Sequence, residues 1–143
     1  MFELETELRE VSLSNNITGI GDKAFYRCHG LMGITIPDSV TSIGSSAFED
    51  CISLVSVTIG NSVTSIGNSA FRGCSSLTNI TIPNNVKNIG ESAFSGCSKV
   101  TNITIGNNEI DSGVINLGKY SFNTGSGLTN VIIGSNIAEV STD

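Results

Sequence analysis

The sequence is built from a 23-residue unit that recurs in tandem. Four consecutive copies align without gaps, at residues 17–39, 40–62, 63–85 and 86–108, and follow the pattern V-T-S-I-G-x-S-A-F-x-x-C-x-x-L-x-x-I-T-I-[PG]-x-[NS]. A period of about 20–50 residues is typical of a solenoid, in which each unit forms one turn and buries its apolar side chains against its neighbours. Such a stack offers a long, uniform surface and no single pocket. The repeat therefore favours a binding or structural protein over an enzyme.

The repeat also extends upstream of these copies. Residues 1–16 match the second half of a turn, with Phe2, Leu8, Val11 and Leu13 at its apolar positions. Four acidic residues lie in the same partial turn: Glu3, Glu5, Glu7 and Glu10. Because the terminal turns of a solenoid need a polar outer face, this cluster is interpreted as a solubilising end, with an anion-rich binding site as the alternative.

The repeat continues downstream with irregularities. Residues 114–136 form a fifth full copy, in which Ser121 replaces the Ala and Gly125 the Cys, so we expect looser core contacts there. An insertion at 109–113 precedes it, which we interpret as a surface bulge, with a binding loop as the alternative, because loop insertions have a small effect on stability. Residues 137–143 begin a further turn. We expect the whole chain to be one domain and a segment of a longer array.

Within one turn, two strands and a short turn segment are expected. In the segment Leu-x-x-Ile-x-Ile, β-branched residues alternate with polar ones, so that Ile80 and Ile82 point inward and Asn79 and Thr81 outward. After a reversal at Pro or Gly, Val-x-x-Ile-Gly forms a shorter strand, whose Gly supplies a positive φ or close backbone packing. The segment Ala-Phe-x-x-Cys is too short for a stable helix and is expected to be one turn of 3₁₀ or α type, with its Phe in the core.

Stacking places equivalent residues of successive turns side by side, about 4.8 Å apart. The outward side chains of the longer strands then form two polar rows, which we expect to bind a partner, with an exposed apolar anchor at either end. These residues are Met32, Thr35, Ser56, Thr58, Asn79, Thr81, Asn102, Thr104, Asn130 and Ile132. Another polar row is expected on the shorter strands: Gly19, Ser42, Ser65, Asn88 and Asn116.

Composition excludes several classes of partner. The net charge is −6 with only seven Lys and Arg, whereas nucleic-acid binding needs clustered cations. No apolar run approaches the roughly 20 residues that cross a bilayer, which argues against membrane insertion, and the first residues lack the pattern of a signal peptide. If the protein is secreted, its signal lies outside this chain.

The cysteines occupy one repeated position, namely Cys28, Cys51, Cys74 and Cys97. Their side chains should run parallel in the core as small apolar fillers, an interpretation favoured over disulfides or a zinc site, and a free-thiol titration after unfolding distinguishes these alternatives. The single histidine, His29, falls at a variable surface position with no nucleophile implied beside it. We predict no catalytic residue, no cofactor site and no metal site.

The repeat resembles the BspA-like, or Treponema pallidum-type, class of leucine-rich repeats. The resemblance rests on Ile-Gly-x-x-Ala-Phe-x-x-Cys, which recurs at 20–28, 43–51, 66–74 and 89–97. It implies a leucine-rich-repeat solenoid of the α/β horseshoe class, rich in β structure. Members of this family are surface proteins of bacteria and some parasitic protists, and the resemblance implies adhesion to host cells, matrix proteins or other microbes.

These observations favour a non-catalytic adhesion module of a cell-surface or secreted protein, which binds an extracellular-matrix or cell-surface protein, or else a glycan, through its strand rows. A structural spacer without a ligand and an intracellular scaffold are the alternatives, and an enzyme is the least favoured. Free strand edges at the two ends also predict end-to-end self-association.

Overall fold

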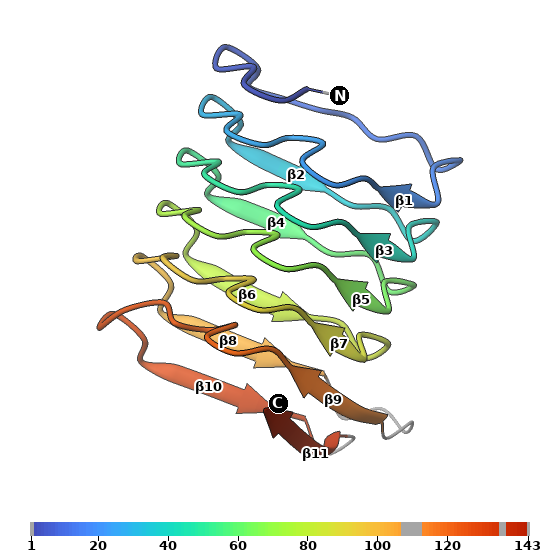
Figure 1. Ribbon diagram of the computed structural model, residues 1–143, viewed down its shortest axis with the longest axis vertical. Coiled ribbons are helices and arrows are strands. Elements are labelled where there is room, and N and C mark those ends of the chain that lie inside the picture. Colours follow the sequence, from blue (N-terminus) through green and yellow to red (C-terminus); the bar gives the residue numbers. More distant parts are fainter. Residues whose placement is uncertain (1, 107–112, 135–136, 143) are drawn as a thin grey trace.

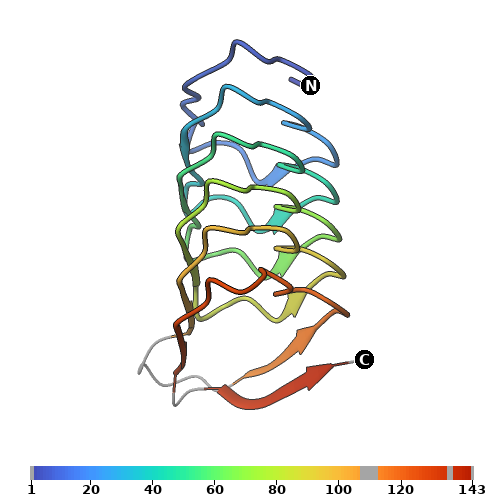
Figure 2. The ribbon, with the colours of Figure 1, turned by 90° about the vertical axis from the view of Figure 1, so that its left-hand side faces the viewer.

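The computed structural model describes residues 2–106, 113–134 and 137–142. The chain winds into a stack of similar turns, with the N-terminus at one end and strands β10 and β11 at the other (Figure 1). A view from the side shows the turns evenly layered along the long axis (Figure 2). The described strands are β1 Gly19–Ile20, β2 Gly33–Thr35, β3 Ser42–Ile43, β4 Ser56–Thr58, β5 Ser65–Ile66, β6 Asn79–Ile82, β7 Asn88–Ile89, β8 Asn102–Ile105, β9 Gly113–Leu117, β10 Asn130–Ile133 and β11 Ile137–Thr142.

The strands form two parallel sets on opposite sides of the stack. The odd-numbered strands make one six-stranded sheet, in the order β1-β3-β5-β7-β9-β11, which we call the second sheet. The even-numbered strands make a two-stranded sheet, β2-β4, and a three-stranded sheet, β6-β8-β10, and we call their outward side the strand face. Gly33 lies opposite Ser56 and Asn79 opposite Asn102, in register, whereas the pairing of β11 with β9 has a register shift between Ile137 and Glu139. The predicted fold class, a β-rich leucine-rich-repeat solenoid with parallel strands, is thus confirmed.

The segment that carries Ala-Phe-x-x-Cys contains no helix among the described residues, so the predicted helical turn is not confirmed. Its backbone N–H groups alternate between two kinds of acceptor. Ala47 donates to Gly44 three residues before it, whereas Phe48 donates to Ala70 of the following turn at 2.7 Å. Ser46, with a φ of 53°, permits this alternation. A helix would use every N–H locally, so the alternation is what joins adjacent turns on this side.

Phenylalanine rings form a column through the core, as the sequence predicts. The column contains Phe2, Phe25, Phe48, Phe71, Phe94 and Phe122. Neighbouring ring centroids lie 5.0 to 5.5 Å apart, with planes within 10° of parallel. The spacing of the turns sets the spacing of the rings, and the column fills the core with rigid apolar volume.

The cysteines are free and buried, and each also makes a hydrogen bond that the sequence does not reveal. The Sγ–H of Cys51 donates to the carbonyl of Phe25 in the preceding turn at 3.1 Å, and Cys74 donates to Phe48 in the same way. The thiol is therefore a small filler and also a weak donor across the turn boundary.

The glycine that follows each of β3, β5, β7 and β9 is needed for close packing, whereas Gly21 after β1 has open space beside it. An added Cβ would lie 2.5 Å from the backbone nitrogen of Asp22 at Gly44, and 2.6 Å from backbone atoms of the preceding turn at Gly67. Neither glycine has a positive φ. Of the two roles predicted for this glycine, close backbone approach is the one that applies.

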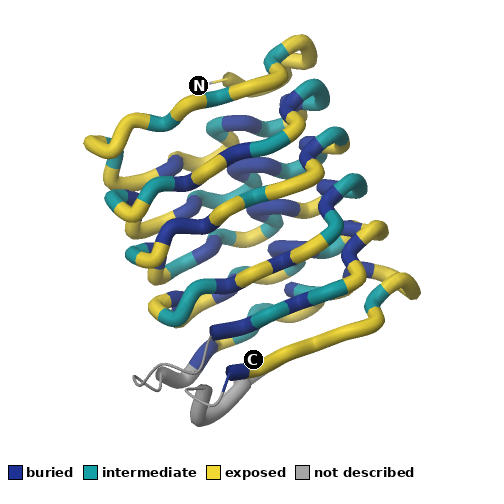
Figure 3. Tube along the Cα trace, turned by 180° about the vertical axis from the view of Figure 1, so that it is seen from behind, coloured by how far each residue is buried: buried dark blue, intermediate teal, exposed yellow. Residues whose placement is uncertain are grey.

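The fifth turn is less buried than the turns before it, although Ser121, which replaces the Ala, is itself buried, so this exposure does not come from that replacement. Phe122 and Leu128 are only partly buried, and β10 is exposed along its length (Figure 3). Strand β10 pairs with β8 alone, while β11 pairs with β9. The insertion at 109–113 lies outside the described residues except for Gly113, the first residue of β9, so its two interpretations stay predictions. End-to-end association also stays a prediction.

Candidate functional site

The strand face gathers the residues that the sequence selects as partner-binding. In β6, the outward residues Asn79 and Thr81 are exposed and the inward residues Ile80 and Ile82 are buried. The other strands of the covered turns follow the same alternation, except that the inward Val57 of β4 is half-buried. Met32, directly before β2, and Ile132 in β10 are 53% and 60% exposed. The structure therefore places the predicted polar residues in rows on one side of the stack, with the apolar residues toward its two ends.

The asparagine row is bonded to itself. Asn102 Nδ2 donates to Asn79 Oδ1 at 2.9 Å, and Asn130 Nδ2 donates to Asn102 Oδ1 at 2.8 Å. Asn102 Nδ2 also donates to the hydroxyl of Thr101. These bonds fix the amide groups in one orientation, so the row is preorganised and part of its hydrogen-bonding capacity is already used.

The threonine row beside it has free hydroxyls. Within the described chain, the hydroxyls of Thr58 and Thr81 make no hydrogen bond to another residue, and both side chains are exposed. Equivalent Thr residues pair in register, for example Thr35 with Thr58 and Thr81 with Thr104. The strand face thus combines a rigid amide row with a row of available donors and acceptors.

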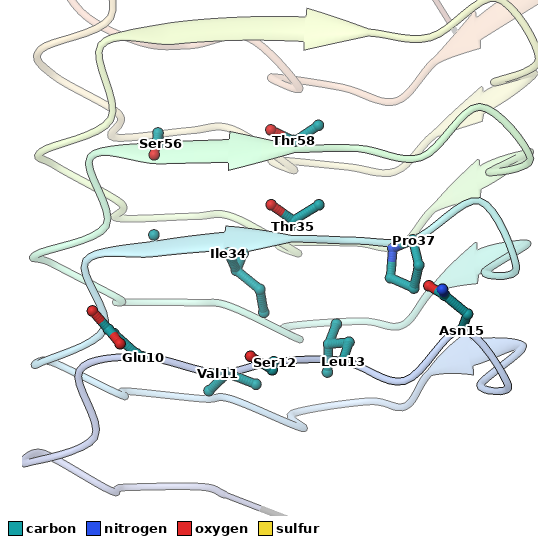
Figure 4. Close-up of a pocket in the computed structure, with 11 residues that line it drawn as sticks. Glu10, Val11, Ser12, Leu13, Asn15, Ile34, Thr35, Pro37, Ser56 and Thr58 are labelled. Carbon is teal, nitrogen blue, oxygen red and sulfur yellow. The ribbon is translucent and has the colours of Figure 1, made fainter.

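A hollow of about 460 Å³ interrupts the strand face near β2 (Figure 4). It forms because the outward row shortens from Asn79 through Ser56 to Gly33, which has no side chain. Glu10, bridged to Gly33, lies on the other side of this gap. The shortening of the row is the one sequence signal that could have revealed the hollow.

A second hollow, of about 530 Å³, adjoins the first and shares Asn15, Thr35, Pro37 and Thr58 with it. It is also lined by Ser39, whose buried Oγ has no hydrogen-bond partner among the described residues. Together the two hollows lie along β2 and the reversal that follows it. The N-terminal half of the strand face is therefore hollowed.

The second sheet carries a groove along its glycine positions. This groove has a volume of about 550 Å³ and is lined by Asn88, Asn116, Glu91 and Lys119 beside Gly90 and Gly118. Asn116 Nδ2 donates to Asn88 Oδ1 at 3.0 Å, which repeats the amide pairing of the strand face. The sequence predicts this polar row. It does not predict the groove, because the groove arises where glycines pack closely against the backbone of the preceding turn.

Charged pairs lie on the side of the turn segments. Arg72 contacts Glu49 at 2.9 Å and Arg27 contacts Asp50 at 3.5 Å. Both arginine side chains are exposed, and ion pairs with an exposed partner contribute little stability. No group of three or more His, Cys, Asp or Glu side chains arranged to hold a metal ion occurs in the described part of the chain, and His29 is half-buried.

The thiols are chemically quiet. Burial raises the pKa of Cys51 and of Cys97 to about 12, and it raises the pKa of Cys74 well above its ordinary range. Burial also raises the pKa of Cys28. Since the thiolate is the nucleophile and the metal ligand, these groups are protonated and unreactive at neutral pH.

Comparison with known proteins agrees with this geometry. A family model for a BspA type leucine-rich repeat region, with six copies, matches residues 1–112 and 106–143. The chain belongs to this family. Leucine-rich-repeat proteins are generally protein-interaction modules. Comparison with curated protein sequences gave no match.

Three solved structures show the same fold as this BspA-type chain. The T. pallidum leucine-rich repeat protein is 27% identical, with a TM-score of 0.66 over 82% of this chain and 67% of that one. A leucine-rich repeat protein from Bacteroides capillosus is 30% identical, with a TM-score of 0.52 over 82% and 63%. A leucine-rich cell surface protein from Faecalibacterium prausnitzii is 28% identical, with a TM-score of 0.59 over 89% and 43%. This chain therefore spans less than two thirds of the length of the last two.

Within the described residues, no helix has the length and apolar character needed to cross a membrane.

Proposed function

We propose that this protein is a non-catalytic recognition module of a cell-surface or secreted protein, and that it binds a protein partner through the strand face. The observation that carries the proposal is the pair of parallel rows, in which the Asn79–Asn102–Asn130 amides are held by mutual hydrogen bonds beside the exposed Thr row. A rigid polar row loses little conformational entropy on binding. The general role of leucine-rich repeats in protein interaction and the cell-surface description of the F. prausnitzii neighbour support it.

The composition of the strand face suits an extracellular-matrix or cell-surface protein as the partner. Its outward rows from Gly33 to Asn130 contain hydroxyls and amides and no charged side chain, so contact depends on hydrogen bonds and shape. A glycan would meet the same hydroxyl and amide groups, so it is the other ligand class to include in a binding screen. A spacer or an intracellular scaffold would bind neither through this face.

The test is binding of the protein to an array of extracellular-matrix proteins, cell-surface proteins and glycans, with two variants of equal added charge. Thr81→Lys/Thr104→Lys places two long cations on the strand face. Thr41→Lys/Thr64→Lys places two on the second sheet, at the row where Lys87 is already exposed.

We expect saturable binding that the strand-face variant abolishes and the second-sheet variant retains, with thermal unfolding almost unchanged in both. Equal binding by the two variants would place the contact elsewhere. No binding to any member of the array would favour the spacer or the scaffold.

A further inference from the structure

The hollow beside Gly33 differs chemically from the rest of the strand face. In this outward row, Gly33 lies between Ser56 and Glu10, whereas the later turns have asparagine at the equivalent position. Because glycine has no side chain, a gap remains there. Figure 4 shows Thr58, Thr35 and Ser12 in an adjacent column, with Pro37 and Asn15 toward the far end of the hollow. A side chain of a partner can enter the gap at Gly33, whereas the asparagine side chains farther along the row leave no such gap.

The lining of the hollow suits a cation with an aliphatic stem. Glu10 is the only charged residue that lines it, and no Lys or Arg is present. Hydroxyl oxygens that can accept hydrogen bonds come from Ser12, Thr35, Ser56 and Thr58. Partly buried Leu13 and Pro37 offer apolar surface, which the methylene groups of Lys and Arg cover well.

The surrounding charge acts in the same direction. Residues 2–16 contain four Glu and a single basic residue, Arg9, and the chain as a whole carries a net charge of −6. This end of the strand face therefore attracts cations during encounter with a partner. No aromatic ring lines the hollow, so it lacks the flat apolar surface on which a sugar ring packs.

We infer that this hollow is a socket for a basic side chain, Lys or Arg, of the protein partner. This inference rests on the proposed function and adds a specificity element to it. The ammonium or guanidinium group lies near the Glu10 carboxylate and donates to the nearby hydroxyls, and the stem extends along the hollow toward Leu13 and Pro37. The Asn and Thr rows supply the broad contact, and the socket selects partners with a protruding cation.

The chain offers a matched pair of glycines for the test. An added Cβ at Gly33 would meet Ser56 Oγ at 3.3 Å, and one at Gly19 on the second sheet would meet Ser42 Oγ at the same distance. Neither glycine has a positive φ, so both accept a side chain if the serine rotates. Gly33→Asn fills the socket with the residue found at positions 79, 102 and 130, while Gly19→Asn repeats the change away from it.

The experiment is an NMR titration of backbone amides with N-acetyl-lysine-N-methylamide. Its neutral analogue N-acetyl-norleucine-N-methylamide and the methyl glycosides of galactose and N-acetylglucosamine are separate arms. Millimolar affinity is sufficient, because amide shifts report weak binding and locate it. The proteins are the wild type, Gly33→Asn, Glu10→Gln and Gly19→Asn, each first checked for an unchanged folded spectrum.

We expect shifts from the lysine probe that saturate and centre on Gly33, Thr35 and Ser56. They should be lost in Gly33→Asn, retained in Gly19→Asn and weakened about fivefold in affinity in Glu10→Gln, the upper range for one partly exposed ion pair. Absence of a localised shift, equal shifts from norleucine, or binding by a glycoside alone would each overturn the inference.

Failure of the socket can be separated from failure of the proposed function. If a partner from the array binds Gly33→Asn as well as the wild type but loses binding to Thr81→Lys/Thr104→Lys, the strand face stands as the binding surface and the socket does not.

Discussion

Turn 63–85 and turn 114–136 are copies of one sequence unit, yet they are buried to very different extents. Phe71 is fully buried, with the rings of Phe48 and Phe94 at 5.0 and 5.1 Å on its two sides. Phe122 is half-buried and has one ring neighbour, Phe94, at 5.4 Å. The two inward residues of β10, Val131 and Ile133, are 54% and 48% exposed.

A single repeat unit therefore does not bury its own apolar residues. The adjacent turns do so, because each ring stacks on its equivalents in the neighbouring copies and isoleucines such as Ile80 and Ile103 lie opposite each other on paired strands. Stability should therefore depend on the position of a residue in the stack as strongly as on its place within the unit. Three predictions examine this difference.

The largest effect is expected from pH, through the thiols of the covered turns. Burial raises the folded-state pKa of Cys51 and Cys97 from an ordinary 9.0 to about 12. Below pH 9 the thiols stay protonated in both the folded and the unfolded chain, and the stability does not depend on them. Between pH 9 and 12 the unfolded chain loses thiol protons that the folded chain retains, so stability falls by about 1.4 kcal/mol per pH unit for each such thiol.

Urea unfolding at a series of pH values measures this dependence. Cys51→Ala should reduce the slope above pH 9 by the share of one thiol. Stability that stays constant to pH 11, or fast labelling of the thiols in the native protein, would contradict the account.

The next effect compares Phe71→Ala with Phe122→Ala. Removal of the fully buried ring should lower the free energy of unfolding by about 3–5 kcal/mol, because a cavity forms between two stacked rings. Phe122→Ala should lower the free energy of unfolding by roughly half as much, because Phe122 is only half-buried. Urea unfolding of both variants gives the difference. Should Phe71→Ala not fold, Phe71→Leu and Phe122→Leu test the same ranking, and equal losses would show that neighbours do not determine burial.

The smallest effect concerns the glycine column. Gly67→Ala places a Cβ 2.6 Å from the backbone of the preceding turn, whereas Gly21→Ala has nothing within 4 Å. We expect Gly67→Ala to lower the free energy of unfolding by about 1–3 kcal/mol through overpacking, and Gly21→Ala to leave it unchanged. Thermal unfolding of the two variants checks this, and a similar melting temperature for both would mean that the turns are not held by close backbone contact.

Much of the fold could be predicted because the repeat determines which residues become neighbours. A fixed period of 23 residues places Asn79 beside Asn102 and Phe48 beside Phe71, and strand alternation decides which side chains point outward. The two polar rows and the phenylalanine column follow from these facts alone.

The remaining features depend on geometry that the pattern does not encode. Lys23 and Ser46 have positive φ without being Gly or Asn, so no residue type signals the alternating hydrogen bonds of that segment. The thiol–carbonyl bonds depend on the offset between turns. The hollow beside Gly33 exists because a side chain is missing from one position between Glu10 and Ser56, which becomes visible only when the turns are aligned side by side.

The most direct test of the central claim is the footprint of a bound partner. Amide hydrogen exchange of the protein, with and without a partner identified on the array, reports which strands become protected. The account predicts added protection on β4, β6 and β8 and none on β5 and β7. Protection confined to β5 and β7 would show that the second sheet, with its glycine groove, is the binding surface and would contradict it.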